Sequence, residues 1–258
     1  MLPPTLIGCS SKSYFSAAQA RAWGPEVMAG VADDAAGPSG LFCCPSFPLI
    51  PTLLDSLGAA GGLVGAQDVS VYGPGSYTGE VSAAVLAELG CRFVMAGRPA
   101  RRRIFGEDDQ PVHRQALATA EAGMAPIIVV GEDVDGASAA DALNAQFDRW
   151  LDGFPAGAEL LVAYEPAWAI GRPQPAPPAH VAETIATVRD LIAQRDTAAR
   201  VVYGGSAQPG TYRAIAAAAG EDVTGVPDGL FMARFGLDVA NFLSIVREVR
   251  EVAGQIGR

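Results

Sequence analysis

The sequence is short of lysine and of long apolar runs. Of its 18 basic residues 17 are arginines, and Lys12 is the sole lysine. No apolar run reaches the roughly 20 residues that a membrane helix needs, and Met1-Leu2-Pro3-Pro4 lacks the charged start of a signal peptide. We therefore expect no membrane partner and a cytoplasmic location.

Basic residues are also too few to balance the acidic ones. The formal net charge is −10, which repels nucleic acid and anionic lipid surfaces and argues against both as partners. A small anionic ligand is still compatible with this charge. It would have to be held by a local cluster of donors rather than by the overall field of the protein.

Cysteine and histidine are scarce and show no metal-binding pattern. No C-x-x-C pair occurs, and no histidine lies at metal spacing from a cysteine. We interpret the cysteines as reduced, mostly buried thiols and predict neither a metal nor a cofactor. Both histidines fall in helical patterns, so we expect them to be solvated helix residues. These residues are Cys9, Cys43, Cys44, Cys91, His113 and His180.

Short apolar runs alternate with helical patterns eight times along the chain. A length of 258 residues suits an α/β protein with a (β/α)8 barrel, the TIM-barrel fold, which takes about 250. We predict a single such domain over residues 1–258. The expected strands are Leu6–Gly8, Leu41–Cys44, Leu63–Ala66, Phe93–Ala96, Pro126–Val130, Leu160–Tyr164, Arg200–Tyr203 and Gly229–Met232; expected helices include Ala17–Ala29, Val81–Leu89, Val112–Ala122, Ala137–Trp150, Pro178–Gln194, Thr211–Ala219 and Val239–Val252.

Glu165 is the most informative single residue. It is the first charge beyond the buried run Glu159–Tyr164, at the strand end where barrels place their active sites. A carboxylate there can simply cap the next helix. The loop Pro166–Gly171 that follows is stiff and glycine-hinged, and this context favours a general base with a lid over a helix cap.

Further polar clusters follow other strands and would meet at the same mouth. Gly204-Gly205-Ser206 lets backbone N–H groups approach an anion, although glycines also serve tight turns alone. The remaining clusters are Ser10-Ser11-Lys12, Gly97-Arg98 and Ala233-Arg234. Lys12 and Arg98 are compatible with ordinary solvated side chains, but the arginine bias of the sequence gives the single lysine special interest.

The sequence resembles the triosephosphate isomerase family. The matching segments keep the family's order over nearly the whole chain, and the segment around Glu165 is highly specific. They are Tyr77–Ala84 with Leu89–Cys91, Phe105–Glu107, Gly131-Glu132, Ala163–Gly171, Tyr203–Ser206 and Asp228–Phe231 with Leu237-Asp238.

The resemblance implies an aldose–ketose isomerase of a small sugar phosphate, in which Glu165 moves a proton between adjacent carbons. Lys12 would face the oxyanion and the phosphate. It further implies a homodimer in which Thr78 reaches the partner's active site. Phosphate contacts are implied for Gly171, Ser206, Ala233 and Arg234, and Ser10 takes the place of an asparagine that precedes the lysine in the family.

Several departures from the family fall inside the expected pocket. Arg98 replaces the electrophilic histidine, and Ala100 replaces an acidic residue that contacts the lysine. The second hinge of the lid, Arg172–Ala176, also differs in sequence from that of the family. Arg98 can stabilise an enediolate by its charge, but a guanidinium keeps its proton in proteins and therefore cannot shuttle protons.

Three functions are compatible with these residues. The first is an isomerase of a triose or tetrulose phosphate; Gly229–Arg234 and Pro175-Ala176 resemble the tetrulose branch more than the glycolytic one. The second is an impaired member that only binds sugar phosphates. In the third, Arg98 clamps the carboxylate of a phosphorylated acid.

Overall fold

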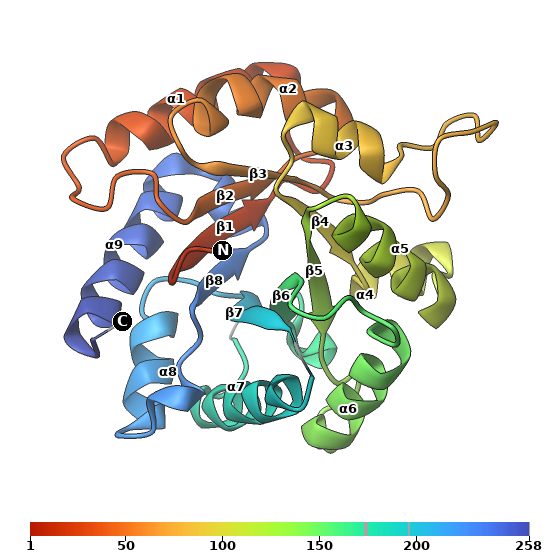
Figure 1. The fold of residues 1–258 in the computed structure, drawn as a ribbon. Helices are drawn as coiled ribbons and strands as arrows, with labels where there is room; N and C mark the ends of the chain where they lie inside the picture. Colours follow the sequence, from red (N-terminus) through yellow and green to blue (C-terminus); the bar gives the residue numbers. More distant parts are fainter. Residues whose placement is uncertain (173–174, 196, 258) are drawn as a thin grey trace.

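The computed structural model describes residues 1–172, 175–195 and 197–257. Within these ranges eight parallel strands close into a barrel in sequence order, because β8 pairs with β1 (Figure 1). The (β/α)8 prediction is confirmed. The strands are β1 Leu6–Ser10, β2 Leu41–Cys44, β3 Leu63–Ala66, β4 Phe93–Ala96, β5 Ala125–Val130, β6 Glu159–Tyr164, β7 Ala198–Gly205 and β8 Gly229–Met232.

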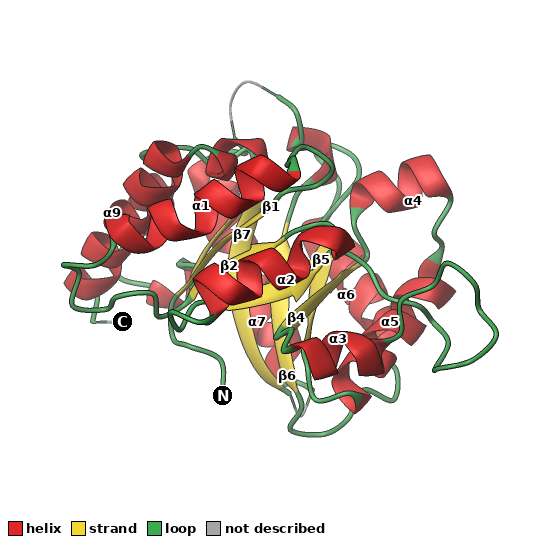
Figure 2. Cartoon of the chain, turned by 90° about the horizontal axis from the view of Figure 1, so that it is seen from above, coloured by secondary structure: helices red, strands yellow, loops and turns green. Residues whose placement is uncertain are grey.

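Helices surround the strands as an outer ring (Figure 1), and the view turned by 90° shows helices lying over the strands (Figure 2). Several begin at a side chain that accepts a hydrogen bond from a backbone N–H of the first turn, as Ser16 does for α1 and Asp238 for α9. The described helices are α1 Ala17–Gly30, α2 Ile50–Leu53, α3 Ala83–Leu89, α4 Pro99–Phe105, α5 Asp109–Glu121, α6 Ala139–Trp150, α7 Pro178–Ala193, α8 Thr211–Ala219 and α9 Val239–Gln255. The helices α2 and α4 were not among those expected from the sequence.

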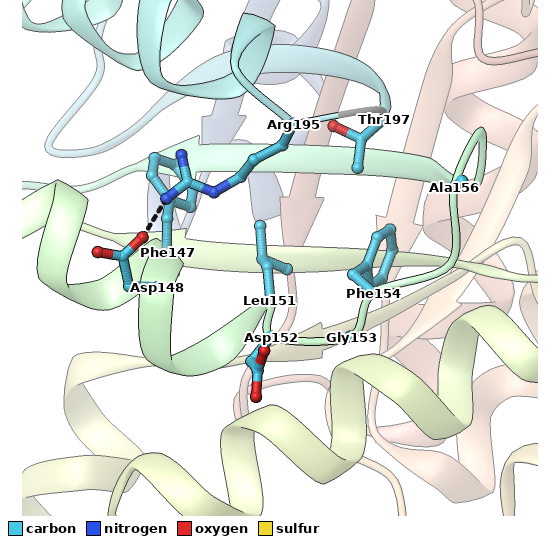
Figure 3. A pocket seen from close by; sticks show the side chains of 9 residues that line it. All are labelled: Phe147, Asp148, Leu151, Asp152, Gly153, Phe154, Ala156, Arg195 and Thr197. Atoms are coloured by element: carbon cyan, nitrogen blue, oxygen red, sulfur yellow. Dashed lines mark hydrogen bonds and ion pairs between the residues drawn. The ribbon is translucent and has the colours of Figure 1, made fainter.

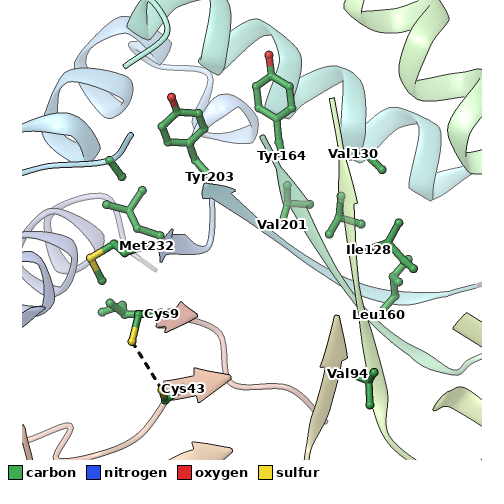
Figure 4. Close-up of a cluster of buried hydrophobic side chains, with 14 of the residues drawn as sticks. Cys9, Cys43, Val94, Ile128, Val130, Leu160, Tyr164, Val201, Tyr203 and Met232 are labelled. Atoms are coloured by element: carbon green, nitrogen blue, oxygen red, sulfur yellow. Dashed lines mark hydrogen bonds between the residues drawn. The ribbon is translucent and has the colours of Figure 1, made fainter. Parts of the chain in front are cut away.

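Two apolar layers hold this architecture together. The larger one lies between the strands and the helices and includes Val94, Ile128 and Leu160 (Figure 4). All four cysteines are buried, as predicted, and Cys9 and Cys43 face each other across β1 and β2 with 3.8 Å between their Sγ atoms. Burial raises the pKa of the Cys43 thiol, which keeps it protonated.

The smaller layer fills the inside of the barrel. The ring of Phe42 packs against those of Phe93 and Phe231, with centroids 5.1 and 5.2 Å away. Gly8 makes this possible, since a Cβ at that position would lie 2.3 Å from the Phe42 ring. The barrel interior is therefore a packed core rather than a channel.

Side chains of each strand alternate between the two layers. Leu161 and Ala163 of β6 belong to the inner layer, so the next residue of this series, Glu165, also points inward at the end of the strand. Val202 of β7 likewise leads to Gly204. The fold thus places the carboxylate of Glu165 above the barrel core, next to Gly204, which has no side chain.

No helix that the structure describes combines the length and the apolar character that crossing a membrane requires.

We predict that Gly229→Ala destabilises the barrel at its closing seam. Gly229 has φ +153° and pairs with Leu6, and an added Cβ would lie 1.8 Å from the Leu6 carbonyl oxygen. We expect a loss of at least about 2 kcal/mol in the free energy of unfolding, measured by urea denaturation. Gly254→Ala is the matched control, because no atom lies within 4 Å of its added Cβ and the residue is helical. Equal stability of the two variants would contradict the prediction.

Candidate functional site

A cavity of about 340 Å³ opens at the carboxyl ends of the strands. It is lined by loops that follow β1, β4, β6, β7 and β8, and the residues predicted from these five strand ends meet there. Seven of the nine predicted site residues line it: Lys12, Arg98, Glu165, Gly171, Ser206, Ala233 and Arg234. Ser10 and Thr78 do not.

Glu165 lies at the floor of this cavity and is only 5% exposed. Its backbone N–H donates to the Val130 carbonyl at 2.8 Å, which extends the pairing of β5 and β6 by one residue. A Cβ at Gly204 would lie 2.6 Å from both Cγ and Oε1 of Glu165. The missing side chain at position 204 therefore provides the space in which this carboxylate stands.

Lys12 adopts a backbone conformation that lysine rarely takes. Its φ is +45°, and it is the sole non-glycine residue with positive φ in the described part of the chain. The amide of Gln67 stabilises this conformation by donating to the carbonyls of Lys12 and Cys44, at 3.0 and 2.8 Å. Strain held in this way by its surroundings is typical of functional positions.

Ser10 supports this lysine from below. Its side chain continues the inward series of β1 and is 1% exposed, and its Oγ accepts the backbone N–H of Lys12 at 3.3 Å. The structure places Ser10 under the site rather than in the lining of the cavity. A direct contact of Ser10 with a ligand stays a prediction.

The lining of the cavity is strongly cationic. Its described residues include Lys12, Arg98, Arg103, Arg172 and Arg234 against the single carboxylate of Glu165. Burial, and then the charges of Arg98 and Arg234, lower the pKa of Lys12, while Glu165 opposes this. A protein with net charge −10 therefore presents a positive pocket, which suits a small anion.

The loop after β6 is tied to the barrel at its start. Trp168 Nε1 donates to Glu132 Oε1 at 2.8 Å, and the Tyr164 hydroxyl donates to the same carboxylate at 3.1 Å. His180 Nε2 lies 2.8 Å from Glu132 Oε1. The prediction of a merely solvated His180 was wrong: its side chain is 32% exposed but joins α7 to this buried carboxylate. His113 is not purely solvated either, since its Nδ1 lies 3.3 Å from the Trp150 carbonyl oxygen.

The same loop is also tied to β7. The Tyr203 hydroxyl accepts the backbone N–H of Ala176 at 3.3 Å, and the Ser206 hydroxyl donates to the Ala169 carbonyl at 3.3 Å. Burial raises the pKa of Tyr203 to about 12, so its phenol stays protonated. The rewritten hinge Arg172–Ala176 includes residues 173 and 174, which lie outside the described residues.

Gly171 of the same loop and the segment after β8 also line the cavity. Gly171 has φ +80°, a conformation that glycine adopts without strain. A 3₁₀ turn at Arg234–Leu237 follows β8, with Ala233 just before it. Both segments line the cavity on the side of β6 to β8. They could supply N–H donors to a phosphate group together with Ser206.

A second hollow of about 310 Å³ lies near the opposite ends of the strands, between the end of α6 and the start of β7 (Figure 3). Its one described cation, Arg195, is already paired with Asp148 and stacks on the Phe147 ring. The arginine thus needs no ligand anion. We therefore place the functional site at the mouth formed by the carboxyl ends of the strands.

Thr78 lies on the long loop between β3 and α3 that extends away from the barrel (Figure 1). It is exposed, and the nearby rings of Tyr72 and Tyr77 stack with centroids 4.3 Å apart. Thr78 does not reach the cavity of its own chain. Its predicted contact with a partner's site is not tested by a single chain.

The comparisons with known proteins agree with this geometry. The model of the family described as "Triosephosphate isomerase" matches residues 5–249. The chain belongs to the triosephosphate isomerase family. It is 34% identical to "L-erythrulose-1-phosphate isomerase" of Pectobacterium atrosepticum, over 96% of this chain and 97% of that protein. It is 36% identical to "Triosephosphate isomerase" of Nitratidesulfovibrio vulgaris, over 79% of this chain and 86% of that protein.

Membership of this family makes the chain a relative of isomerases, and the resemblance predicted from the sequence is confirmed. The structure adds three residues that the sequence analysis gave no role: Gln67, Glu132 and Tyr203. Each occupies or follows the end of a strand, as the predicted site residues do. The position of Glu132 directly after β5 and a glycine was the signal that could have identified it.

We predict that Glu132→Ala loosens the loop after β6. The variant leaves the Trp168 N–H and His180 without their acceptor, which we expect to cost about 1–3 kcal/mol of unfolding free energy. Urea denaturation measures the loss, and limited proteolysis near residue 170 measures the loosening. Glu183→Ala, an exposed glutamate of α7, is the control and should change stability by less than about 0.5 kcal/mol. Resistance to protease equal to that of the parent would refute the assignment.

We predict that Lys12 titrates below the ordinary lysine value of 10.5. Labelling with ¹³C,¹⁵N-lysine yields one side-chain signal, because the chain has one lysine. The Cε shift followed against pH gives its pKa directly. Arg98→Met should raise the pKa of Lys12 and Glu165→Gln should lower it further, since a repelling and an attracting charge are removed respectively. The same pKa in all three proteins would show that these side chains do not share one site.

Proposed function

We propose that this protein is an aldose–ketose isomerase of a small sugar phosphate, a triose or a tetrulose phosphate. The observation that carries the proposal is the inward-facing carboxylate of Glu165 in a cavity that also holds Lys12 and a set of phosphate-binding groups. The names of the relatives, "L-erythrulose-1-phosphate isomerase" and "Triosephosphate isomerase", support this substrate class.

In the proposed reaction Glu165 removes a proton from the carbon beside the substrate carbonyl and returns it to the neighbouring carbon. The intermediate is an enediolate whose negative charge lies on two oxygens. Lys12 and Arg98 stabilise that charge as fixed cations in a partly desolvated cavity. Because Arg98 keeps its proton, the transfer between the two oxygens falls to Glu165 or to a water molecule.

The phosphate group is assigned to the side of the mouth that is built by β6, β7 and β8. Gly171 and Ser206 donate to it, and the backbone near Ala233 and the guanidinium of Arg234 complete the set. A tetrulose phosphate is favoured by the resemblance of Gly229–Arg234 to that branch and by a relative of that activity that covers nearly the full chain. We further propose a cytoplasmic homodimer with Thr78 beside the partner's cavity, which the exposed Tyr77 and Phe105 support.

A second candidate function is binding without efficient turnover. Arg98 and Ala100 favour it, because the cavity lacks a side chain that can both donate and accept a proton at position 98. Such a protein would be stabilised thermally by glycerol 3-phosphate and would still fail to convert either sugar phosphate. Coupled assays with glyceraldehyde 3-phosphate and with erythrulose phosphate separate the two functions.

We predict that Glu165→Gln lowers kcat by about 10²–10⁴, because the amide cannot take up the proton. The measurement is the coupled assay with both sugar phosphates. Binding of glycerol 3-phosphate should be retained, since the substitution removes a negative charge from a cationic cavity. Glu26→Gln, on the exposed side of α1, is the control and should leave kcat unchanged. Activity of Glu165→Gln within threefold of the parent would remove Glu165 from the role of base.

A further inference from the structure

Arg98 is a nearly buried cation for which the described part of the chain supplies no carboxylate partner. It lines the cavity, is 9% exposed, and its Nη1 contacts the Met95 sulfur at 3.3 Å. Among the residues that the structure describes, Arg98 takes part in no ion pair. A buried guanidinium without a counter-ion is costly, and its five N–H groups far exceed what a thioether can accept.

Arg101, a neighbour of Arg98, has carboxylate partners of its own. Arg101, one turn further along α4, binds Glu107 through Nε at 2.6 Å and Asp68 through Nη2 at 2.9 Å. These contacts fix α4 to the barrel and leave Arg98 at its first turn facing the cavity. The backbone at Arg98 is thus positioned by the protein itself, without a ligand.

The position of Arg98 in the ring also matters. Arg98 follows β4, whereas the proposed phosphate donors follow β6, β7 and β8. In a closed barrel of eight strands β4 stands opposite β8. Glu165 follows β6, midway between them in the strand order, and Lys12 follows β1, next to β8. A small molecule that spans the cavity would put its phosphate on one side and its far end against the guanidinium.

We propose that Arg98 forms a second anion subsite, and that the cavity selects a small phosphorylated acid with a phosphate at one end and a carboxylate at the other. The planar guanidinium can hold a carboxylate through two parallel hydrogen bonds. The charges favour this ligand, because one phosphate neutralises only part of a lining that carries five cations and one carboxylate. This inference rests on the proposed function for the phosphate side of the cavity. At the opposite side it puts a carboxylate where a triose or tetrulose phosphate is neutral, so the ligand that it names is a phosphorylated sugar acid.

The test compares two probes that differ only at the far end. 3-Phosphoglycerate carries a carboxylate where glycerol 3-phosphate carries a hydroxymethyl group. Calorimetry on the full chain should show at least about 10-fold tighter binding of the acid. In Arg98→Met that preference should fall to below about twofold while glycerol 3-phosphate still binds. Arg103→Met, which removes an exposed arginine of the same cavity, should keep the preference.

The outcomes separate this inference from the proposed function. If the parent protein binds the two probes with equal affinity, the proposed subsite is wrong, and no variant is needed to show it. The isomerase proposal is tested separately by the coupled assay. A preference that survives in Arg98→Met also overturns it. Should Arg98→Met not fold, Arg98→Gln serves in its place. If the parent protein binds neither probe, the assignment of the phosphate-binding side is wrong, and the proposed subsite at Arg98 is then wrong as well.

Discussion

The site depends on one geometric constraint, the inward and outward alternation of side chains in a closed parallel barrel. Because Leu161 and Ala163 point into the barrel core, Glu165 must follow them inward at the end of β6. A shift of one residue in the register of β6 would turn the carboxylate toward the helices. The pairing of β6 with β7 over its whole length, and with β5 from Leu161 to Tyr164, holds that register.

The inward carboxylate of Glu165 needs space around it and a suitable electrostatic field. Gly204 on the adjacent strand provides the room. The field comes from arginines and one lysine on loops of separate strands, which meet only because the sheet closes. An acidic protein can therefore attract a small anion to one place while it repels nucleic acid and anionic surfaces elsewhere.

Much of the fold could be predicted from the sequence because each parallel strand is buried on both faces. Such strands read as short apolar runs between helices, and all eight were found with small errors at their ends. The helix α4 was missed for a physical reason. It is short, has no buried residue and carries three arginines, so it has no apolar face to detect.

The mouth of the barrel was predictable in part. Glu165, Lys12 and Arg98 each follow a strand, and strand ends meet at one rim. The contact of Glu132 with His180 was not, since 48 residues separate them and neither local sequence specifies the other. The support of Lys12 by Gln67 was hidden likewise, because it joins loops 55 residues apart.

Position 12 shows how fold and chemistry make opposite demands on one residue. Its backbone has the left-handed geometry in which glycine would rest without strain, yet the cavity uses an ammonium group there. The amide of Gln67 donates to the Lys12 carbonyl and so stabilises the left-handed backbone conformation with lysine in place. Selection for stability alone would thus favour glycine at position 12, and glycine would remove the ammonium group from the cavity.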